Sequence, residues 1–338
     1  LLFLTKKYSS DLSLRDKKNL KIIVLPNFFE KIFYRIIWIN FGIPFFLIFY
    51  NVKVLYSPMN IAPLTIFFLK TKLILGMHTT LPWEFPELIP GNLIRNLLMK
   101  KIMEISIKNS HKTIFCSKSS LLILQKKLRI NKKKLTYIYL GPGNDLKIKN
   151  LKNFNYKDKY ILSVISCTRY HMILQMIKSF EKVYAKNKNI KFILVMSILD
   201  NKFYNEIYKY VLKKRLYNNV IFINNLESKY LGEIYRNSTL YIHSSLTESF
   251  GFTTLEAMKS GTMVLASDRK ASREVNSNAA IFFNPYDIID LKRKILKYLL
   301  IRRRKKYIKM GKRRVKNFSW KKNFDLTFFE IKKLVNTN

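Results

Sequence analysis

Short runs of β-branched and aromatic residues alternate with longer segments of helical periodicity along nearly the whole chain. This alternation is typical of parallel β-sheets that are covered by helices. Before residue 145 the pattern predicts six strands, at residues 1–4, 20–25, 52–57, 72–77, 112–117 and 136–140.

A polar, lysine-rich segment without periodicity, GPGNDLKIKNLKNFNYKDKY, follows these strands and predicts a domain boundary near residue 150. The alternation then resumes and predicts six further strands, at residues 160–165, 191–196, 220–223, 239–243, 262–266 and 279–283. We therefore expect an α/β protein with two doubly wound parallel-sheet domains that face a central cleft. The domains expected are residues 1–150 and 151–319, followed by a helix at 320–338 whose apolar side is formed by Phe324, Leu326, Phe328, Phe329 and Ile331.

The composition is that of a globular protein with a strongly basic surface. Of 338 residues 48% are apolar, and 63 Lys and Arg oppose 21 Asp and Glu, which gives a formal net charge of +42. Such a charge attracts acidic lipid headgroups, phosphorylated substrates or nucleic acid, and it does not choose among them.

Compartment and membrane signals favour a cytoplasmic location. Cys116 and Cys167 lie in apolar strand-like runs, which predicts buried free thiols in a reducing compartment. The most apolar run, residues 36–50, is shorter than the roughly 20 residues needed to span a bilayer. It predicts a buried or interfacial helix, and no signal peptide is visible.

One passage, TESFGFTTLEAMKSGTMVLAS at residues 247–267, predicts an anion site. A strand precedes a tight turn through Ser249, Phe250 and Gly251. A helix is then expected to begin near Thr253 and to end at Gly261. The free N–H groups of about residues 251–254 and the helix dipole would bind a phosphate, and Gly251 would let the backbone approach it closely.

Two glutamates flank this turn. Glu256, one helical turn further on, is placed to accept hydrogen bonds from the hydroxyls of a ribose, and Glu248 lies on the side where a sugar would be held. An alternative is that residues 253–256 form a capping box in which Glu256 serves only its own helix. Asp268 and Glu274 are expected to cap or brace local loops.

The segment SSLTESFGFTTLEAMKSGTMVLASDRKASREVNSNAAIFFNPYD, residues 244–287, resembles the donor-site segment of group 1 (family 4) glycosyltransferases of the GT-B fold. In that family it reads roughly P-S-x-x-E-G-F-G-x-x-x-x-E-A-M. The resemblance implies two Rossmann-like domains, a nucleotide-sugar donor and retention of anomeric configuration. It implies that Glu256 binds the donor ribose, that Glu248 contacts the donor sugar, and that the amides of Phe250, Gly251 and Phe252 face the diphosphate. Ser249 and Thr253 are also expected to bind the donor.

Other segments resemble the same family less sharply. KLILGMHTT resembles its strand ending in a histidine that approaches the donor sugar, which nominates His78 as catalytic. HKTIFCSKSSLLIL resembles a strand, serine and helix at the rim of the cleft. Where the family commonly has an Arg and a Lys against the diphosphate, this chain has Ser166 and His171, and we expect Arg169 to substitute as a bidentate phosphate ligand. His171 would be the weaker counter-charge.

The expected reaction moves a sugar from a UDP- or GDP-sugar to a glycan or lipid-linked acceptor in cell-surface polysaccharide synthesis. No Asp-x-Asp motif occurs, so we expect a metal-independent reaction without a cofactor, in which helix dipole and cationic side chains stabilise the diphosphate. LLFLTKK resembles the second strand of the usual first domain, and a first strand and helix are expected to be missing.

Three alternatives stay open. Ser166, His171 and the missing first loop are compatible with a degenerate, non-catalytic partner subunit. The charge is compatible with nucleic-acid binding, although no motif for it occurs and we expect no nucleic-acid partner. The helix-like segment at residues 91–112 mixes an apolar side with lysines, so it is either an ordinary packed helix or a peripheral contact with the anionic inner face of the membrane.

Overall fold

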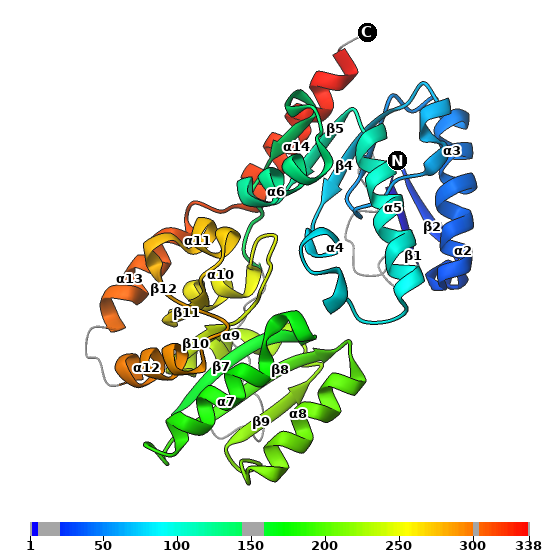
Figure 1. Ribbon diagram of the computed structural model, residues 1–338. Coiled ribbons are helices and arrows are strands. Elements are labelled where there is room, and N and C mark those ends of the chain that lie inside the picture. Colours follow the sequence, from blue (N-terminus) through cyan, green and yellow to red (C-terminus); the bar gives the residue numbers. More distant parts are fainter. Residues whose placement is uncertain (1, 6–20, 144–158, 300–303, 337–338) are drawn as a thin grey trace.

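The computed structural model describes residues 2–5, 21–143, 159–299 and 304–336. Twelve strands form within them, and each overlaps one of the twelve that the alternating pattern predicts. Residues 1 and 20 of the first two expected strands and the boundary expected near residue 150 lie outside the described residues. Two parallel-sheet α/β domains result, as the sequence predicts (Figure 1).

The first domain contains a four-stranded parallel sheet in the order β3-β4-β5-β6 and a separate parallel pair, β1 and β2. The strands are β1 (Leu2–Thr5), β2 (Ile22–Leu25), β3 (Val54–Ser57), β4 (Lys72–Met77), β5 (Lys112–Phe115) and β6 (Leu135–Tyr137). The helices are α2 (Ile32–Ile37), α3 (Ile43–Phe49), α4 (Leu81–Glu84), α5 (Leu93–Asn109) and α6 (Lys118–Leu128). β4 is buried along almost its whole length, because helices cover both faces of the sheet.

The second domain has one six-stranded parallel sheet in the order β12-β11-β10-β7-β8-β9. Its strands are β7 (Tyr160–Cys167), β8 (Lys191–Ile198), β9 (Val220–Asn224), β10 (Leu240–His243), β11 (Val264–Ser267) and β12 (Ala280–Phe283). The strand order reverses direction between β10 and β7, which is the switch point of a doubly wound sheet. The covering helices are α7 (Ile173–Tyr184), α8 (Asn201–Lys213), α9 (Ser228–Asn237), α10 (Phe252–Lys259), α11 (Lys270–Asn276), α12 (Ile288–Leu299) and α13 (Arg304–Val315).

The last helix, α14 (Trp320–Asn336), returns to the first domain. Trp320 Nε1 donates to the Pro142 carbonyl at 2.9 Å, and Ile331 and Leu334 pack against the first sheet. The expected apolar side of this helix is wrong for four of its five residues, because Phe324, Leu326, Phe328 and Phe329 are exposed and only Ile331 packs. Its packed face instead follows the spacing of Thr327, Ile331 and Leu334, a less apolar stripe that periodicity alone did not select.

The predicted buried thiols are confirmed, since Cys116 and Cys167 are both buried and free. Burial raises the pKa of Cys116 to about 12 and that of Cys167 to about 11, so both thiols are neutral at pH 7. The apolar run at residues 36–50 forms a helix that is half buried, with Leu47 in the core. Among the described residues, no helix has the length and apolar character needed to cross a bilayer.

Candidate active site

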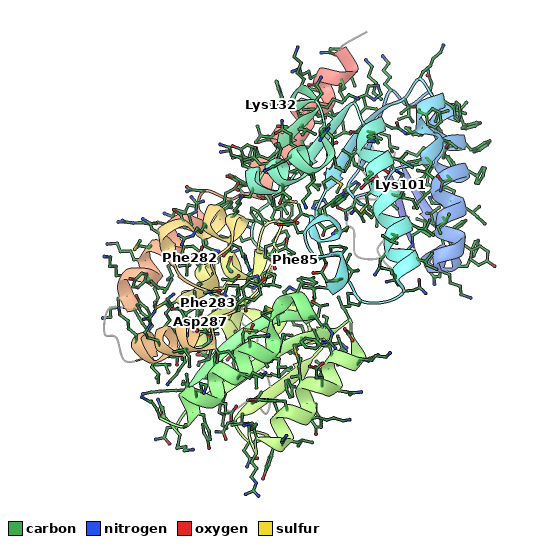
Figure 2. The ribbon with its side chains drawn as sticks, viewed as in Figure 1. Phe85, Lys101, Lys132, Phe282, Phe283 and Asp287 are labelled. Carbon is green, nitrogen blue, oxygen red and sulfur yellow. The ribbon has the colours of Figure 1, made fainter. Side chains whose placement is uncertain are left out.

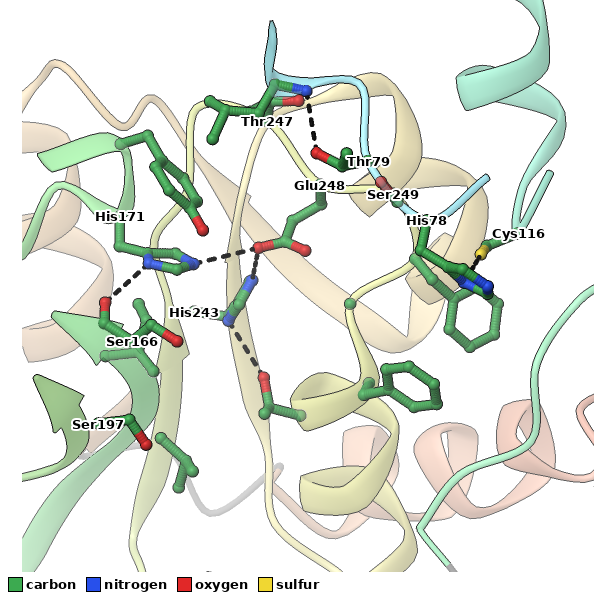
Figure 3. Close-up of a pocket in the computed structure, with 18 of the residues that line it drawn as sticks. His78, Thr79, Cys116, Ser166, His171, Ser197, His243, Thr247, Glu248 and Ser249 are labelled. Atoms are coloured by element: carbon green, nitrogen blue, oxygen red, sulfur yellow. Dashed lines mark hydrogen bonds and ion pairs between the residues drawn. The ribbon is translucent and has the colours of Figure 1, made fainter. Parts of the chain in front are cut away.

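A cavity of about 460 Å³ lies between the two domains, outside the carboxyl ends of the strands (Figure 3). The first domain contributes the segment after β4, from His78 to Leu81, and Cys116 after β5. The second domain contributes the ends of β7, β8 and β10 and the turn that precedes α10. Since β7 and β10 flank the point where the strand order reverses, the cavity occupies the place where open α/β sheets bind ligands.

The turn before α10 is built as the sequence predicts, with the helix starting at Phe252. Gly251 adopts φ +85°, a left-handed conformation that residues with a Cβ rarely take. Its carbonyl accepts hydrogen bonds from Thr254 N at 3.2 Å and Thr254 Oγ1 at 2.8 Å. The first N–H groups of a helix have no partner inside it, so Phe252 and Thr253 present an anion-binding helix start to the cavity that they line.

Glu248 lies in the wall of the cavity between two histidines. Its Oε1 is 3.0 Å from His243 Nε2 and 3.6 Å from His171 Nε2 (Figure 3). Burial by itself would raise the pKa of Glu248, but the hydrogen bonds and attraction of the two imidazoles outweigh it and hold the pKa well below its usual range. The carboxylate therefore stays ionised at any pH near neutral.

The two imidazoles are oriented by their other nitrogens. His171 Nδ1 lies 2.8 Å from both the Ser166 carbonyl and the Thr168 hydroxyl. His243 Nδ1 lies 3.3 Å from Thr253 Oγ1, which ties the strand end to the first turn of α10. His243 is a residue that the sequence reasoning missed. The sequence pattern that could have indicated His243 is a polar residue at the end of an apolar strand, five positions before Glu248.

His78 faces the cavity from the first domain. The residue is exposed, its Nδ1 lies 3.0 Å from Cys116 Sγ, and its backbone N donates to Asn60 Oδ1 at 2.5 Å. The surrounding protein still desolvates the ring enough to lower the pKa of His78. Its placement at a strand end across from Glu248 matches the prediction, whereas its catalytic role stays a prediction.

Glu256 does not line the cavity and lies one turn further along α10. The capping-box alternative is wrong, because the helix is preceded by Gly251 as its N-cap and Thr253 Oγ1 points to His243. Glu256 Oε2 accepts a hydrogen bond from the Tyr235 hydroxyl at 3.1 Å. Burial raises the pKa of Glu256, against the opposing effect of this bond.

Arg169 was expected to bind the diphosphate in this cavity, but its side chain lies elsewhere. Its guanidinium donates to Glu206 at 2.9 Å, lies 3.9 Å from Asp200 and stacks over the Phe203 ring. It is not among the residues that line the cavity, because acidic groups near α8 hold it outside. Among the described lining residues the basic side chains are all histidines: His78, His171 and His243.

Ser166, Ser249 and Phe250 also line the cavity, as expected. Phe250 is buried and its ring packs against Tyr139 and Phe318, so only its backbone is available to a ligand. Ser249 offers a carbonyl to Ser120 Oγ of the first domain at 3.2 Å. The turn is thus held in place by the packing of the Phe250 ring and by the hydrogen bond that Ser249 accepts from the first domain.

Glu274 was expected to cap or brace a local loop. That prediction is wrong, because the residue connects the two domains. Its carboxylate, on α11, accepts hydrogen bonds from the backbone N–H groups of Lys118 and Ser119 at the start of α6. Both N···O distances are 2.7 Å. It also accepts the Tyr139 hydroxyl at 2.9 Å. Asp268 does act locally, through Arg273. No group of three or more His, Cys, Asp or Glu side chains in the described part of the chain is arranged to hold a metal ion.

The fold and the cavity define a two-domain α/β protein of the GT-B class, with a cavity between the domains. The chain belongs to the group 1 glycosyltransferases, whose family model matches residues 144–314. It is 24% identical over 211 residues to the O-antigen chain mannosyltransferase RfbU of Salmonella typhimurium. That match covers 62% of this chain and 56% of the relative, so the chain spans little more than half of the relative's length.

Solved structures show the same fold across nearly the whole chain. Sucrose-phosphate synthase from Thermosynechococcus elongatus superposes with a TM-score of 0.73 at 16% identity, covering 96% of this chain and 87% of that one. Anabaena HepE, in complex with UDP and glucose, gives a TM-score of 0.72 at 15% identity over 92% and 86%. A glycosyltransferase from Rickettsia africae gives 0.71 at 18% identity over 95% and 86%.

Proposed function

We propose that the protein transfers a sugar from a nucleotide-diphosphate sugar to a glycan or lipid-linked acceptor. The observation that carries the proposal is the cavity between the domains, where an ionised carboxylate, Glu248, lies beside the open start of α10. The N-terminus of a helix binds phosphate, and a carboxylate accepts hydrogen bonds from the hydroxyl groups of a sugar. The two side by side therefore suit a ligand that combines phosphates with a sugar. Membership of the group 1 glycosyltransferases supports the same reading.

In this proposal the diphosphate lies against the N–H groups of Phe252 and Thr253, with the imidazole of His171 nearby. Glu248 accepts hydroxyls of the donor sugar, and His78 approaches that sugar from the first domain. Glu256 takes the ribose hydroxyls one turn further along α10. The roles of Glu248, Glu256 and His78 are those that the sequence resemblance implies. Arg169 is removed from the set because its guanidinium is already paired with Glu206 and Asp200.

The acceptor hydroxyl forms a new bond to the anomeric carbon while the bond from that carbon to the diphosphate oxygen breaks. The hydroxyl proton passes to the departing phosphate, and we propose that the anomeric configuration is retained. The helix dipole and the oriented imidazole of His171 stabilise the charge that develops on the diphosphate, with no metal ion required. The proposed donors are UDP- and GDP-sugars, in line with the UDP named in the HepE structure.

The mannosyltransferase relative acts on an O-antigen chain, which supports a role in cell-surface polysaccharide synthesis. We place the protein in the cytoplasm, peripheral to the inner face of the membrane, where a lipid-linked acceptor is found. A second candidate is a non-catalytic partner subunit. It is favoured by the finding that histidines, and neither Lys nor Arg, are the basic side chains among the described lining residues.

Thermal unfolding with UDP-, GDP- and ADP-sugars tests the donor, because a ligand that binds only the folded state raises the melting temperature. Glu248→Gln and Glu256→Gln are each expected to reduce donor turnover about 10- to 100-fold, the worth of a charged hydrogen bond. Glu227→Gln, at an exposed position outside the cavity, is the matched control. Wild-type turnover in both site variants would reject the assignment, and no turnover of any donor by the intact protein would favour the non-catalytic candidate.

A further inference from the structure

The first domain carries a long helical rod with an exposed apolar side. The helix α2, a π-helical turn (Trp38–Gly42) and α3 run on without interruption from Ile32 to Phe49. Leu47 points into the core, whereas Phe41 is 69% exposed and Phe45 62%. Figure 2 shows side chains along this rod projecting away from the rest of the domain.

Six of the exposed apolar residues recur at intervals of three or four and so share one face of the rod, whereas the exposed Ile36 lies off that face. We call them the apolar ridge, and they are Tyr34, Ile37, Phe41, Phe45, Ile48 and Phe49. Next to the ridge, the exposed Phe67 and Phe68 are carried by a 3₁₀ helix (Leu64–Phe68). This helix is fastened to the middle of the rod, where Leu64 N donates to Asn40 Oδ1 at 2.9 Å. Contiguous exposed apolar surface of this kind marks an interaction site.

After Glu30, the charged residues of the segment that carries the ridge are all positive. No Asp or Glu occurs in the sequence between Glu30 and Glu84. Exposed Lys31 lies at the start of the rod, and exposed Lys53 and Lys70 lie beyond its end. Two copies of this chain that met along the ridge would bring these cations together, whereas anionic lipid headgroups would neutralise them.

We propose that the apolar ridge docks on the surface of an anionic phospholipid bilayer, with the rod lying in the plane of the interface. Its rings enter the boundary between headgroups and acyl chains, and the flanking lysines meet lipid phosphates. In Figure 1 the rod lies at the edge of the first domain that is remote from the second, so docking leaves the cavity between the domains accessible. The inference rests on the proposed membrane location but not on sugar transfer.

Co-sedimentation with phospholipid vesicles tests the proposal on the full chain. The probes are phosphatidylcholine vesicles with and without phosphatidylglycerol. The test variant is the triple change Phe41→Ser, Phe45→Ser and Phe49→Ser. The control is the triple change Leu199→Ser, Tyr217→Ser and Ile289→Ser, which removes comparably exposed apolar side chains from the second domain.

The wild type and the control are expected to bind the anionic vesicles, and the ridge variant to bind them at least about tenfold more weakly. Circular dichroism and the melting temperature show whether the variants are folded. Equal binding by the ridge variant would mean that net charge alone holds the protein, and would overturn the proposal. A wild-type dimer that the ridge variant dissociates, without vesicle binding, would assign the ridge to a second copy. Donor turnover by the same samples reports the proposed enzyme separately from vesicle binding.

Discussion

Replacing His243 with phenylalanine tests whether the histidine pair around Glu248 holds the cavity wall together. The change keeps a ring of similar shape in a fully buried place but removes the Nε2 donor that lies 3.0 Å from Glu248 Oε1. It also removes the contact with Thr253 Oγ1 at the start of α10. His243→Gln is the matched control, because its amide nitrogen can reach the same carboxylate.

The expected loss of stability depends on which hydrogen-bond partners the Glu248 carboxylate keeps. Glu248 retains His171 at 3.6 Å, so the change removes one of two partners and not the whole cluster. A hydrogen bond to a charged group contributes about 1.5–3 kcal/mol to stability. For a domain of this size that corresponds to a fall of about 3–12 °C in melting temperature, and His243→Gln should recover much of it.

The effect should depend on pH in a defined direction. The pKa of Glu248 is held below its ordinary value of 4.5 in the folded protein. A carboxyl group with a lowered folded pKa contributes stability that is present above the unfolded pKa and is lost as the pH falls toward the folded one. The difference between wild type and His243→Phe is therefore full at pH 7 and shrinks below about pH 4.5.

Urea and thermal unfolding of the three proteins, at pH 7 and at pH 4, measure these differences. If His243→Phe unfolds with the wild-type midpoint at pH 7, the contact contributes nothing and the reasoning is refuted. Equal losses in the phenylalanine and glutamine variants would show that the shape of the ring, and not its hydrogen bond, is what matters.

Two further changes probe the backbone of the site and the contact between the domains. Gly251→Ala should destabilise the protein by about 1–2 kcal/mol, because the position has φ +85° while the new Cβ meets nothing closer than Thr254 Oγ1 at 3.6 Å. Gly251→Asn should be milder, and an unchanged urea midpoint for the alanine variant would contradict the strain argument. Glu274→Ala should lower the free energy of unfolding by about 1–3 kcal/mol through lost hydrogen bonds to the start of α6. Glu274→Gln should lose less, and equal stability of Glu274→Ala and wild type in thermal unfolding would speak against this contact.

The strands could be predicted because parallel strands buried on both faces leave continuous apolar runs in the sequence. β4 and β7 are clear examples, with nearly every residue buried. Helix faces were harder. In α14 the exposed side carries Phe324 and Phe329, more apolar than the packed side, so periodicity selected the wrong stripe.

The turn at residues 249–251 was predictable because strand, turn and helix follow one another directly, and local geometry needs no distant partner. Contacts between remote segments were not. Glu274 meets Ser119, 155 positions away, and Arg169 is drawn from the cavity by Glu206 on α8. His243 was hidden within an apolar strand, since a pattern of apolar residues does not show which side chain at a strand end turns toward a carboxylate.

The contact of Glu274 with the start of α6 makes this part of the interface between the domains electrostatic in character. Moving the domains apart would expose a carboxylate and the positive end of a helix, and dissolved ions would then stabilise both. Raising the ionic strength should thus weaken this contact between the domains, whereas the apolar core of each domain should be little affected. Under the proposed function, the rate at which the spent nucleotide leaves the cavity between the domains would then depend on the salt concentration.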